Sequence, residues 1–395
     1  MRRPLGNIAS DLNVDCPVVV LNTHYSGVAI GRDLGRLGVR VIGLSSLEKS
    51  PGRGSRWIEF RLAPDSFSQE SELRTFLMRL ADELTVRAIL LPTRDHDINF
   101  MSRHRAELEE RFVIPLISPD ALDQVMNKEV LAHTARRAGL NVPATIIVHR
   151  PSELESARSL RFPCVCKPVY ASQWRQAGIW ESVGRQKALR VESYGALEAF
   201  YEGFAHLDPL ITVQEWISGG DSSLLIFGSH CSPTHEVAAF FTARKRLQYP
   251  PLAGTGIVVE AVLLPELEEQ SRDLLRVLQF RGISEIEYKR DDRDGTLYLI
   301  EVNPRHWDQH GLGSSVGVNL SEALYRDATG QSQRPMRQSG ERKLWIAEIE
   351  YARHLARCLI GRAPWRDALV GLGAPRVGAT LEWGDLGPFI SNLIH

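Results

Sequence analysis

The first hundred residues alternate short apolar runs with polar loops and amphipathic stretches. Residues 16–21 form an apolar run that predicts a buried strand, followed by a polar loop at 22–27 and a helical pattern over 28–37 that ends at Gly38. Residues 39–44 are apolar again and predict the next strand. A strand, a helix and a second strand in this order make a βαβ unit, so the chain begins with an α/β domain built on a parallel sheet.

A second unit brings another polar loop to the end of a strand. Residues 87–91 predict a strand, and residues 92–97 form the loop before the next helix. Ligands of open α/β sheets bind beyond the carboxyl ends of strands, so residues 22–26 and 93–97 are candidate positions for a small polar molecule. The alternative is that Asp95 only caps the following helix. The glycines of the first unit lack the G-x-G-x-x-G spacing, which argues against dinucleotide binding there.

Beyond a long helix the pattern changes to strands and hairpins. The helix is predicted over residues 119–138 and stops at Gly139, and strands follow at residues 144–148, 164–169, 211–217, 223–227, 236–242 and 256–264 before a helix at 266–279. This order predicts a second domain of the α+β class. We expect domains at residues 1–125 and 126–335, and a packing appendage at 336–395. The predicted appendage helix has an apolar stripe made of Trp345, Ile349, Tyr351, Leu355 and Ile360.

The composition is that of a globular protein without a dominant charge. Of 395 residues 43% are hydrophobic, and 47 basic side chains stand against 48 acidic ones, for a formal net charge of −1. This balance argues against an extended nucleic-acid interface and against a polybasic membrane anchor. No apolar run approaches the roughly 18 residues that span a bilayer. We therefore expect a cytoplasmic protein with no membrane or nucleic-acid partner, and its five scattered cysteines are expected to be reduced.

Two alternating runs joined by an acidic turn predict a hairpin over residues 283–303. With the turn centred on Asp294, Glu287 faces Glu301 and Glu285 faces Asn303. Facing carboxylates repel unless they share a proton or bind a cation, and oxygen ligands without His or Cys favour Mg²⁺. The alternative is a strand slip of two residues that leaves the carboxylates in water. The opposite face of the hairpin is predicted to be apolar, with Ile286, Tyr288, Tyr298, Ile300 and Val302.

This hairpin resembles the metal-binding hairpin of a known superfamily. Glu287, followed after the turn by Glu301 and Asn303-Pro304-Arg305, is similar to the pattern of the ATP-grasp ligases, which include biotin carboxylase, carbamoyl phosphate synthetase and D-alanine ligase. The chain is most similar to the predicted ATP-dependent carboligase, or carboxylate-amine ligase, group. The resemblance covers residues 1 to about 330. It implies a Rossmann-like domain before an ATP-grasp domain, with a small nucleotide-clamping subdomain at about residues 140–217, and metal binding by Glu287, Glu301 and Asn303.

Other landmarks of the superfamily occur in the expected order and imply a nucleotide site. Lys128 matches the lysine near the nucleotide phosphates, and Lys167 matches the second nucleotide lysine. Residues 214–217 resemble the hinge strand whose backbone meets adenine, and Asp221 has the spacing of the ribose-binding acid. The implied cofactors are ATP and Mg²⁺, with Mn²⁺ as an alternative metal. The hinge-strand residues implied in nucleotide binding are Gln214, Glu215, Trp216 and Ile217.

Independent physical arguments support two of these positions. Lys167 is flanked by apolar strand residues, so it needs a partner, which is either a triphosphate or an ordinary salt bridge. Arg305 comes directly after the proposed metal ligands, where its guanidinium would suit a carboxylate or an acyl phosphate.

Three consecutive cations, Arg244, Lys245 and Arg246, are also candidates for contact with the phosphates. We expect Arg244 and Lys245, together with Arg305, to be catalytic, and a solvated basic turn is the alternative for the first two. One departure from the superfamily concerns residues 170–178, which contain a single glycine where a glycine-rich flap is usual. Side chains at 173–175, including Trp174, are expected to cover the phosphates instead.

Together these features predict an ATP- and Mg²⁺-dependent ligase. It would phosphorylate a small-molecule carboxylate and let an amine displace the phosphate, which requires positioning and charge stabilisation more than a nucleophilic side chain. Two alternatives stay open: a small-molecule kinase with the same fold, and a nucleotide-binding regulatory protein without turnover. A homodimer is left open as the oligomeric state.

Overall fold

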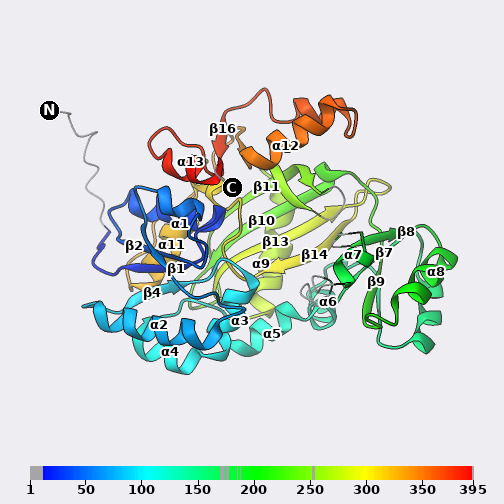
Figure 1. Cartoon of the computed structure of the whole chain (residues 1–395), viewed down its shortest axis with the longest axis horizontal. Helices are drawn as coiled ribbons and strands as arrows, with labels where there is room; N and C mark the ends of the chain where they lie inside the picture. The colour runs from blue at the N-terminus through cyan, green and yellow to red at the C-terminus, as the bar shows by residue number, and fades with distance from the viewer. Residues whose placement is uncertain are drawn as a thin grey trace.

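Three sheets form the framework of the protein (Figure 1). The computed structural model describes residues 12–169, 174, 178–184, 186, 188–250 and 254–393. The N-terminal sheet and a large central sheet lie side by side, and a small sheet stands at the other end of the molecule (Figure 1). The fold is mixed α/β and α+β, as predicted.

The N-terminal sheet is parallel throughout. Its strand order is β3-β2-β1-β4-β5. Successive strands are added on one side of β1 as far as β3 and on its other side from β4 onward, and this change of side creates a ligand crevice in α/β folds. The central strands are buried on both faces because helices cover both sides. Its elements are β1 (Val18–Leu21), α1 (Tyr25–Gly35), β2 (Val41–Ser45), η1 (Pro51–Gly54), β3 (Glu59–Leu62), α2 (Glu70–Glu83), β4 (Ala88–Leu91), α3 (Asp95–Arg103), α4 (Arg105–Arg111) and β5 (Phe112–Val113).

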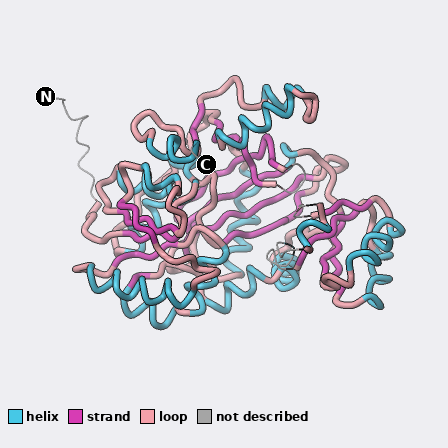
Figure 2. The backbone as a smooth tube through the Cα atoms, viewed as in Figure 1, coloured by secondary structure: helices cyan, strands magenta, loops and turns pink. Residues whose placement is uncertain are grey.

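The small sheet has the strand order β6-β9-β7-β8 and a hydrophobic core of its own. It is reached through two helices that follow the N-terminal sheet (Figure 2). The elements of this part are α5 (Pro119–Met126), α6 (Lys128–Arg137), β6 (Thr145–Val148), η2 (Pro151–Ser159), β7 (Cys164–Pro168), α7 (Ile179–Ser182), β8 (Leu189–Val191), α8 (Tyr194–Phe204) and β9 (Ile211–Glu215).

The large sheet has seven strands in the order β14-β13-β10-β11-β12-β15-β16. Its last two strands belong to the C-terminal segment, so this segment extends the sheet as well as packing on it. The elements are η4 (Asp221–Ser223), β10 (Leu224–Cys231), β11 (Val237–Tyr249), β12 (Thr255–Ala261), η5 (Pro265–Leu267), α9 (Glu268–Val277), β13 (Gly282–Arg290), β14 (Leu297–Asn303), α10 (Gly311–Ser315), α11 (Leu320–Ala328), β15 (Leu344–Ile346), α12 (Glu348–Leu359), η6 (Trp365–Leu369), β16 (Arg376–Gly378) and α13 (Gly387–Leu393).

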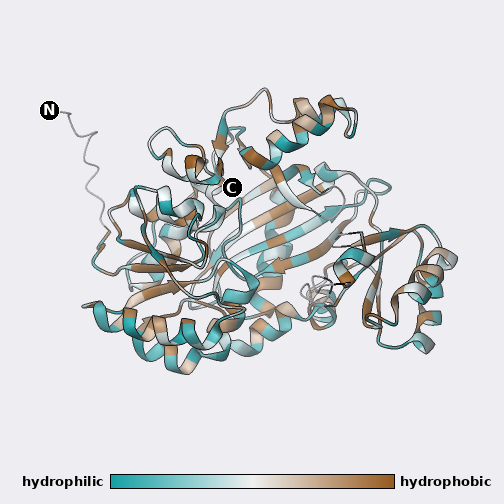
Figure 3. Cartoon of the chain, viewed as in Figure 1, coloured by the Kyte–Doolittle hydropathy of each residue, from teal (hydrophilic) through white to brown (hydrophobic). Residues whose placement is uncertain are grey.

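Two hydrophobic cores run through the N-terminal and large sheets together. One joins α2 and α3 to α5, α9 and one face of the large sheet, and the other joins α1 to α10, α11 and the opposite face. The central strands accordingly carry consecutive apolar residues, as at positions 224–227 of β10, and the strands of this sheet show both apolar and polar stretches in Figure 3. These two sheets are therefore one packed body, whereas the small sheet is a separately packed unit. The domain boundaries themselves stay predictions.

Two predicted helices differ from those observed. The helix predicted over residues 119–138 is interrupted at Asn127, whose side chain accepts hydrogen bonds from the backbone N–H groups of Glu129 and Val130 and so starts a new helix. In the C-terminal segment, Trp345 lies in β15, and Ile360 follows α12 with 64% of its surface exposed. The predicted apolar stripe was therefore wrong at both ends.

The C-terminal end of the chain returns to the N-terminal sheet. Arg32 of α1 is buried and its Nε donates to Oδ2 of Asp385 at 3.0 Å, while its Nη2 donates to the carbonyl of Thr380 at 2.6 Å. Helix α13 packs on η1 at a pair of glycines, where a Cβ atom added to Gly387 would lie 1.8 Å from the carbonyl oxygen of Gly54. No helix among the described residues is long and apolar enough to cross a membrane.

Candidate active site

The hairpin of β13 and β14 places four polar side chains on one face of the large sheet. Glu287 pairs with Glu301 and Glu285 pairs with Asn303, as the sequence predicts. The register then shifts by one residue, because Ile300 has no partner and forms a bulge. The predicted apolar face is therefore wrong near the turn: Leu299 is buried there, and Tyr298 and Ile300 are only partly buried.

A buried lysine faces these carboxylates. Nζ of Lys245 lies 2.6 Å from Oε1 of Glu287, and the Lys245 side chain is only 6% exposed. Burial opposes the charge of this ammonium, but the carboxylates of Glu287, Glu285 and Glu301 hold the pKa of Lys245 above its usual value. The structure therefore brings Lys245 to the predicted metal ligands.

The carboxylates still carry more negative charge than one lysine balances. Nδ2 of Asn303 donates to Oε2 of Glu285 at 2.9 Å, but Oε1 of Glu285 is buried without a hydrogen-bond partner in the described part of the chain. Burial and the neighbouring Glu287 raise the pKa of Glu285, and partial withdrawal from water together with Glu287 raises that of Glu301. A site of this kind is suited to a cation.

The donor set fits a hard divalent metal held partly by other groups. No cluster of three or more His, Cys, Asp or Glu side chains in the described ranges is placed to enclose a metal ion. Glu287, Glu301 and the amide of Asn303 supply oxygen ligands from one side, and Mg²⁺ characteristically completes such a partial set with phosphate oxygens and water. Assignment of these three residues as metal ligands remains a prediction.

Arg305 lies beside this cluster and contacts the N-terminal domain. Its Nε donates to Oδ1 of Asp95 at 2.6 Å, and its side chain is 16% exposed. The start of α3 is instead capped by Asp97, which accepts from the backbone N–H of Arg94 at 3.0 Å. Asp95 is thus directed to Arg305, and this contact joins the loop after β4 to the loop after β14.

Lys167 is half-buried and contacts an amide instead of a carboxylate. Its Nζ donates to Oε1 of Gln214 at 2.7 Å, and Nε2 of Gln214 donates to Oγ1 of Thr145 at 2.9 Å. Burial lowers the pKa of Lys167 to about 7, and nearby Lys128 lowers it further, against the effect of Glu301. The structure therefore places Lys128, Lys167 and Glu301 within electrostatic reach of one another. Among the described residues, no carboxylate forms an ion pair with Lys128 or Lys167.

The predicted hinge strand connects the small sheet to the large one. The N–H of Glu215 donates to the carbonyl of Ala144 at 2.9 Å, and that of Trp216 donates to the carbonyl of Pro163 at 2.9 Å. The Glu215 side chain accepts from the N–H of Arg161 at 2.8 Å. These three groups are thus engaged within the protein, and Ile217 follows them at the junction between the sheets.

Asp221 and Trp216 have partners that the sequence did not predict. Both carboxylate oxygens of Asp221 bind Gln248, one through its backbone N–H at 2.7 Å and the other through Nε2 at 3.0 Å. Nζ of Lys289 lies 4.1 Å from the centre of the Trp216 ring. Burial lowers the pKa of Lys289 to about 8. Lys289 shares its parity with Glu285 and Glu287 along β13, a signal that could have placed it on the same face.

The structure separates Arg244 from this site. Neighbouring residues of a strand point to opposite faces, so Arg244 points away from the face that Lys245 occupies. Nη2 of Arg244 and Nη1 of Arg246 bind Glu260 at 2.8 and 2.6 Å, and Arg342 binds the same carboxylate. Burial would raise the pKa of Glu260, but these hydrogen bonds lower it to about 2. The three cations lie within β11, not in a turn after it.

Most of the glycine-poor flap lies outside the described residues, which include only Trp174 and Gly178 of residues 170–178. Trp174 is 1% exposed and lies in the core of the small sheet, with its ring centre 5.5 Å from that of Phe204. The expectation that Trp174 covers the phosphates is therefore wrong.

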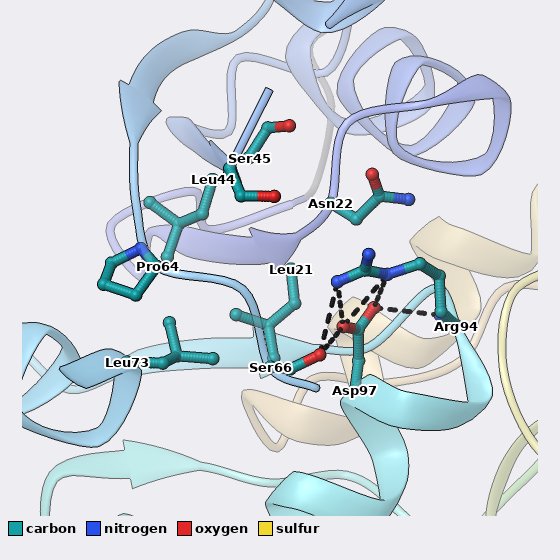
Figure 4. Close-up of a pocket in the computed structure, with 10 residues that line it drawn as sticks. Leu21, Asn22, Leu44, Ser45, Pro64, Ser66, Leu73, Arg94 and Asp97 are labelled. Carbon is teal, nitrogen blue, oxygen red and sulfur yellow. Dashed lines mark hydrogen bonds and ion pairs between the residues drawn. The ribbon is translucent and has the colours of Figure 1, made fainter. Parts of the chain in front are cut away.

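A small polar recess opens at the carboxyl ends of the N-terminal strands (Figure 4). Asn22 and Ser45 line it on one side, and Arg94 lies across from them with its guanidinium bound to Asp97. Asn22 adopts a left-handed backbone conformation with φ of 67°, and its Nδ2 donates to Oγ1 of Thr93 at 3.2 Å. Asparagine adopts this conformation more readily than most non-glycine residues, so Asn22 allows the tight turn after β1. Use of this loop in substrate binding stays a prediction.

Comparison with known proteins shows which proteins this chain resembles in fold and sequence. Models of known protein families give no match to the chain. Solved structures similar to it include ATP-grasp ligases, which agrees in fold with the resemblance seen in the sequence. The N5-carboxyaminoimidazole synthetase of Staphylococcus aureus has a TM-score of 0.66 at 15% identity, covering 89% of this chain and 88% of that one. The L-amino acid ligase of Bacillus licheniformis has a TM-score of 0.60 at 18% identity, covering 83% and 78%.

A sequence relative extends the likeness beyond the fold. The D-aspartate ligase of Enterococcus faecium is 24% identical over 335 residues, which is 78% of this chain and 78% of the relative. The related proteins are ATP-dependent ligases that form C–N bonds, the class predicted from the sequence.

Proposed function

We propose that this protein is an ATP- and Mg²⁺-dependent ligase that joins a carboxylate to an amine through an acyl phosphate. The observation that carries the proposal is the set of facing carboxylates, Glu287 and Glu301, with Asn303 beside them and Lys245 and Arg305 next to them. Phosphoryl transfer to a carboxylate needs such a combination of metal ligands and cations.

In this proposal the nucleotide lies between the small sheet and the large sheet. Lys167 and Lys128 would face its phosphates. The triphosphate would then be the anionic partner of the half-buried ammonium of Lys167, which contacts the amide of Gln214 in the structure. The strand at residues 214–217 would hold the base, and Asp221 the ribose. Mg²⁺, or Mn²⁺ in its place, would neutralise the phosphates when bound by Glu287, Glu301 and Asn303.

The remaining residues position the reacting groups. A substrate carboxylate oxygen attacks the terminal phosphorus of ATP and ADP leaves, after which an amine attacks the acyl carbon, phosphate leaves and the amine loses a proton. Arg305, which contacts Asp95, would bind the negative charge of the acyl phosphate. The loops at residues 22–26 and 93–97 would hold a substrate beside it.

Amino acids are the first substrates to test. Two of the similar proteins are named for amino acids, as a D-aspartate ligase and an L-amino acid ligase. Both L and D amino acids therefore belong in the substrate panel, as carboxylate and as amine. Cytoplasmic location and a homodimer stay predictions.

The test combines an ADP-release screen with a chemical trap. The purified protein would receive ATP, Mg²⁺ and pairs of amino acids, and mass spectrometry would identify the product. Hydroxylamine in place of the amine converts an acyl phosphate to a hydroxamate. ADP release across the panel without any hydroxamate or amide would favour the kinase alternative, and ATP binding without ADP release would favour a regulatory protein.

An arginine variant tests the residue assignment in the same assay. Arg305→Ala should lose most of kcat with little change in ATP affinity, because the contact strengthens in the transition state. Arg293→Ala is the matched control, since Arg293 binds Asp291 in the turn of the same hairpin, away from the carboxylate face. Equal loss in both variants would contradict the assignment.

A further inference from the structure

Residues 351–376, here called the C-terminal arm, project from the rest of the protein. The arm comprises most of α12, the segment through η6 and the approach to β16. It lies along the outer edge of the large sheet, at the margin of the molecule opposite α2 and α4 (Figure 1). The inner side of α12 is fixed to the body through the buried residues Tyr351, His354 and Cys358.

The outer side of the arm exposes large apolar side chains close together in the sequence. Leu359 is 88% exposed and Trp365 is 73% exposed. Large exposed apolar patches mark interaction surfaces, and the exposed large apolar side chains of the arm all fall within residues 359–372. The further exposed members are Ile360 at 64%, Leu369 at 52% and Leu372 at 49%.

The same arm concentrates positive charge. It contains five arginines and one acidic residue, Asp367, although the whole chain has a net charge of −1. Asp367 is engaged by His354 at 3.3 Å, and no carboxylate among the described residues forms an ion pair with any of the five arginines. The arginines are Arg353, Arg357, Arg362, Arg366 and Arg376.

The acidic residues that begin α12 do not offset this charge, because they face the body. Glu348 accepts from the backbone N–H of Leu381 at 2.7 Å, and Glu350 accepts from the hydroxyl of Tyr25 at 2.7 Å. Negative charge therefore points inward, while positive charge and apolar side chains point outward.

We propose that the C-terminal arm docks the protein on the surface of an anionic phospholipid bilayer. Leu359, Ile360 and Trp365 would enter the boundary between headgroups and acyl chains, and the arginines would contact lipid phosphates with their stems along the apolar layer. The combination favours a bilayer over an acidic protein, because exposed apolar side chains from the end of α12 to η6 lie among arginines, and a bilayer offers an apolar layer directly beneath its phosphates. The near-neutral total charge of the chain gives no indication of this local positive surface.

The test is co-sedimentation of the full-length protein with lipid vesicles. Vesicles of phosphatidylcholine with about a third phosphatidylglycerol should bind it, and pure phosphatidylcholine should bind it far less. Arg362→Glu/Arg366→Glu should lower the partition coefficient by at least about tenfold, since each basic residue near an anionic surface contributes substantially. Leu359→Ser/Trp365→Ser should also lower it at unchanged protein charge.

Matched controls make the same kinds of substitution outside the C-terminal arm. Arg79→Glu/Arg137→Glu changes two exposed arginines on α2 and α6, and Leu62→Ser/Val277→Ser changes two side chains that are 57% and 45% exposed. Both controls should bind like the unaltered protein, and circular dichroism should show that all variants are folded.

Three outcomes would overturn the proposal. The first is no binding to anionic vesicles. The second is equal loss in arm variants and controls, which would indicate attraction by charge without a defined surface. The third is a dimer in sedimentation velocity that disappears in the arm variants without any vesicle binding, which would assign the arm to self-association. None of these outcomes depends on turnover, so the result is independent of the proposed ligase activity.

Discussion

Replacing Lys245 by methionine tests the electrostatic balance of the carboxylate face. The ammonium lies 2.6 Å from Glu287, and the two side chains are 6% and 13% exposed. At an effective dielectric constant of about 20, unit charges at this separation attract by about 6 kcal/mol, and desolvation offsets part of that attraction. Methionine keeps the volume and removes the charge, so Glu285, Glu287 and Glu301 would face one another without a cation.

We expect Lys245→Met to destabilise the protein without ligands by about 3–5 kcal/mol, the usual cost of removing one partner of a buried pair. The loss should be smaller at about pH 5 than at about pH 8, because Glu285 has a raised pKa and takes up a proton that relieves the repulsion. Urea denaturation followed by circular dichroism at both pH values measures the difference. The double variant Lys245→Met/Glu287→Gln should lose less stability than Lys245→Met alone, since it removes both charges of the pair.

Two results would refute this reasoning. If Lys245→Met lowers the free energy of unfolding by less than about 1 kcal/mol at both pH values, the pair is screened like a surface ion pair. A double variant less stable than the single one would mean that Glu287 is held by interactions other than Lys245.

Four further changes test other parts of the structure. Glu301→Gln should abolish ATP turnover with the fold intact by circular dichroism, and full turnover with unchanged Mg²⁺ dependence would contradict the metal assignment. Lys167→Ala should weaken ATP binding by about 2 kcal/mol in calorimetry, and an unchanged Kd would place the nucleotide elsewhere. Burial raises the pKa of Asp33 from 3.8 to about 7, so the free energy of unfolding should fall by on the order of 4 kcal/mol as pH rises from about 4 to about 7. Urea denaturation of Asp33→Asn should not show this fall, and an unchanged fall would exclude Asp33 as its source. Gly387→Ala should lower the thermal midpoint, at a cost of about 1–3 kcal/mol, because the added Cβ meets the backbone of η1 at 1.8 Å, whereas Gly384→Ala, whose added Cβ meets nothing closer than 3.9 Å, should not.

The parts predictable from the sequence are those set by short-range rules. Alternation along two strands and the position of one turn gave the pairing of Glu287 with Glu301 and of Glu285 with Asn303. The parallel N-terminal sheet likewise followed from successive strand, loop and helix patterns. The bulge at Ile300 was not predictable, because the extra residue changes the register without a glycine or proline to mark it.

The parts that failed depend on partners distant in the sequence. The three consecutive cations of β11 looked equivalent, but strand alternation sends Arg244 to Glu260 and Lys245 to Glu287. Trp174 was predicted to cover the phosphates, because no local pattern in the sequence indicates that its side chain packs in the core of the small sheet. The contact between Arg305 and Asp95 joins residues 210 apart and was not predicted, because Asp95 was considered only as a substrate-binding residue or a helix cap.

The ion pair between Arg32 and Asp385 has a consequence for how the protein is synthesised. These residues are 353 positions apart, and both are buried. At about 5–20 residues per second, a ribosome needs on the order of 20–70 seconds to translate the interval. During that time α1 has emerged with an arginine whose buried counter-ion does not yet exist.

The N-terminal sheet must therefore await the last residues of the chain before its final packing can form. Because β15 and β16 also come from this end, the large sheet lacks its outer strands over the same period. A premature stop just before β15 would thus remove both the outer strands of the large sheet and the counter-ion of Arg32. Truncated chains should be cleared by cellular proteolysis, even though every proposed catalytic residue had already been made.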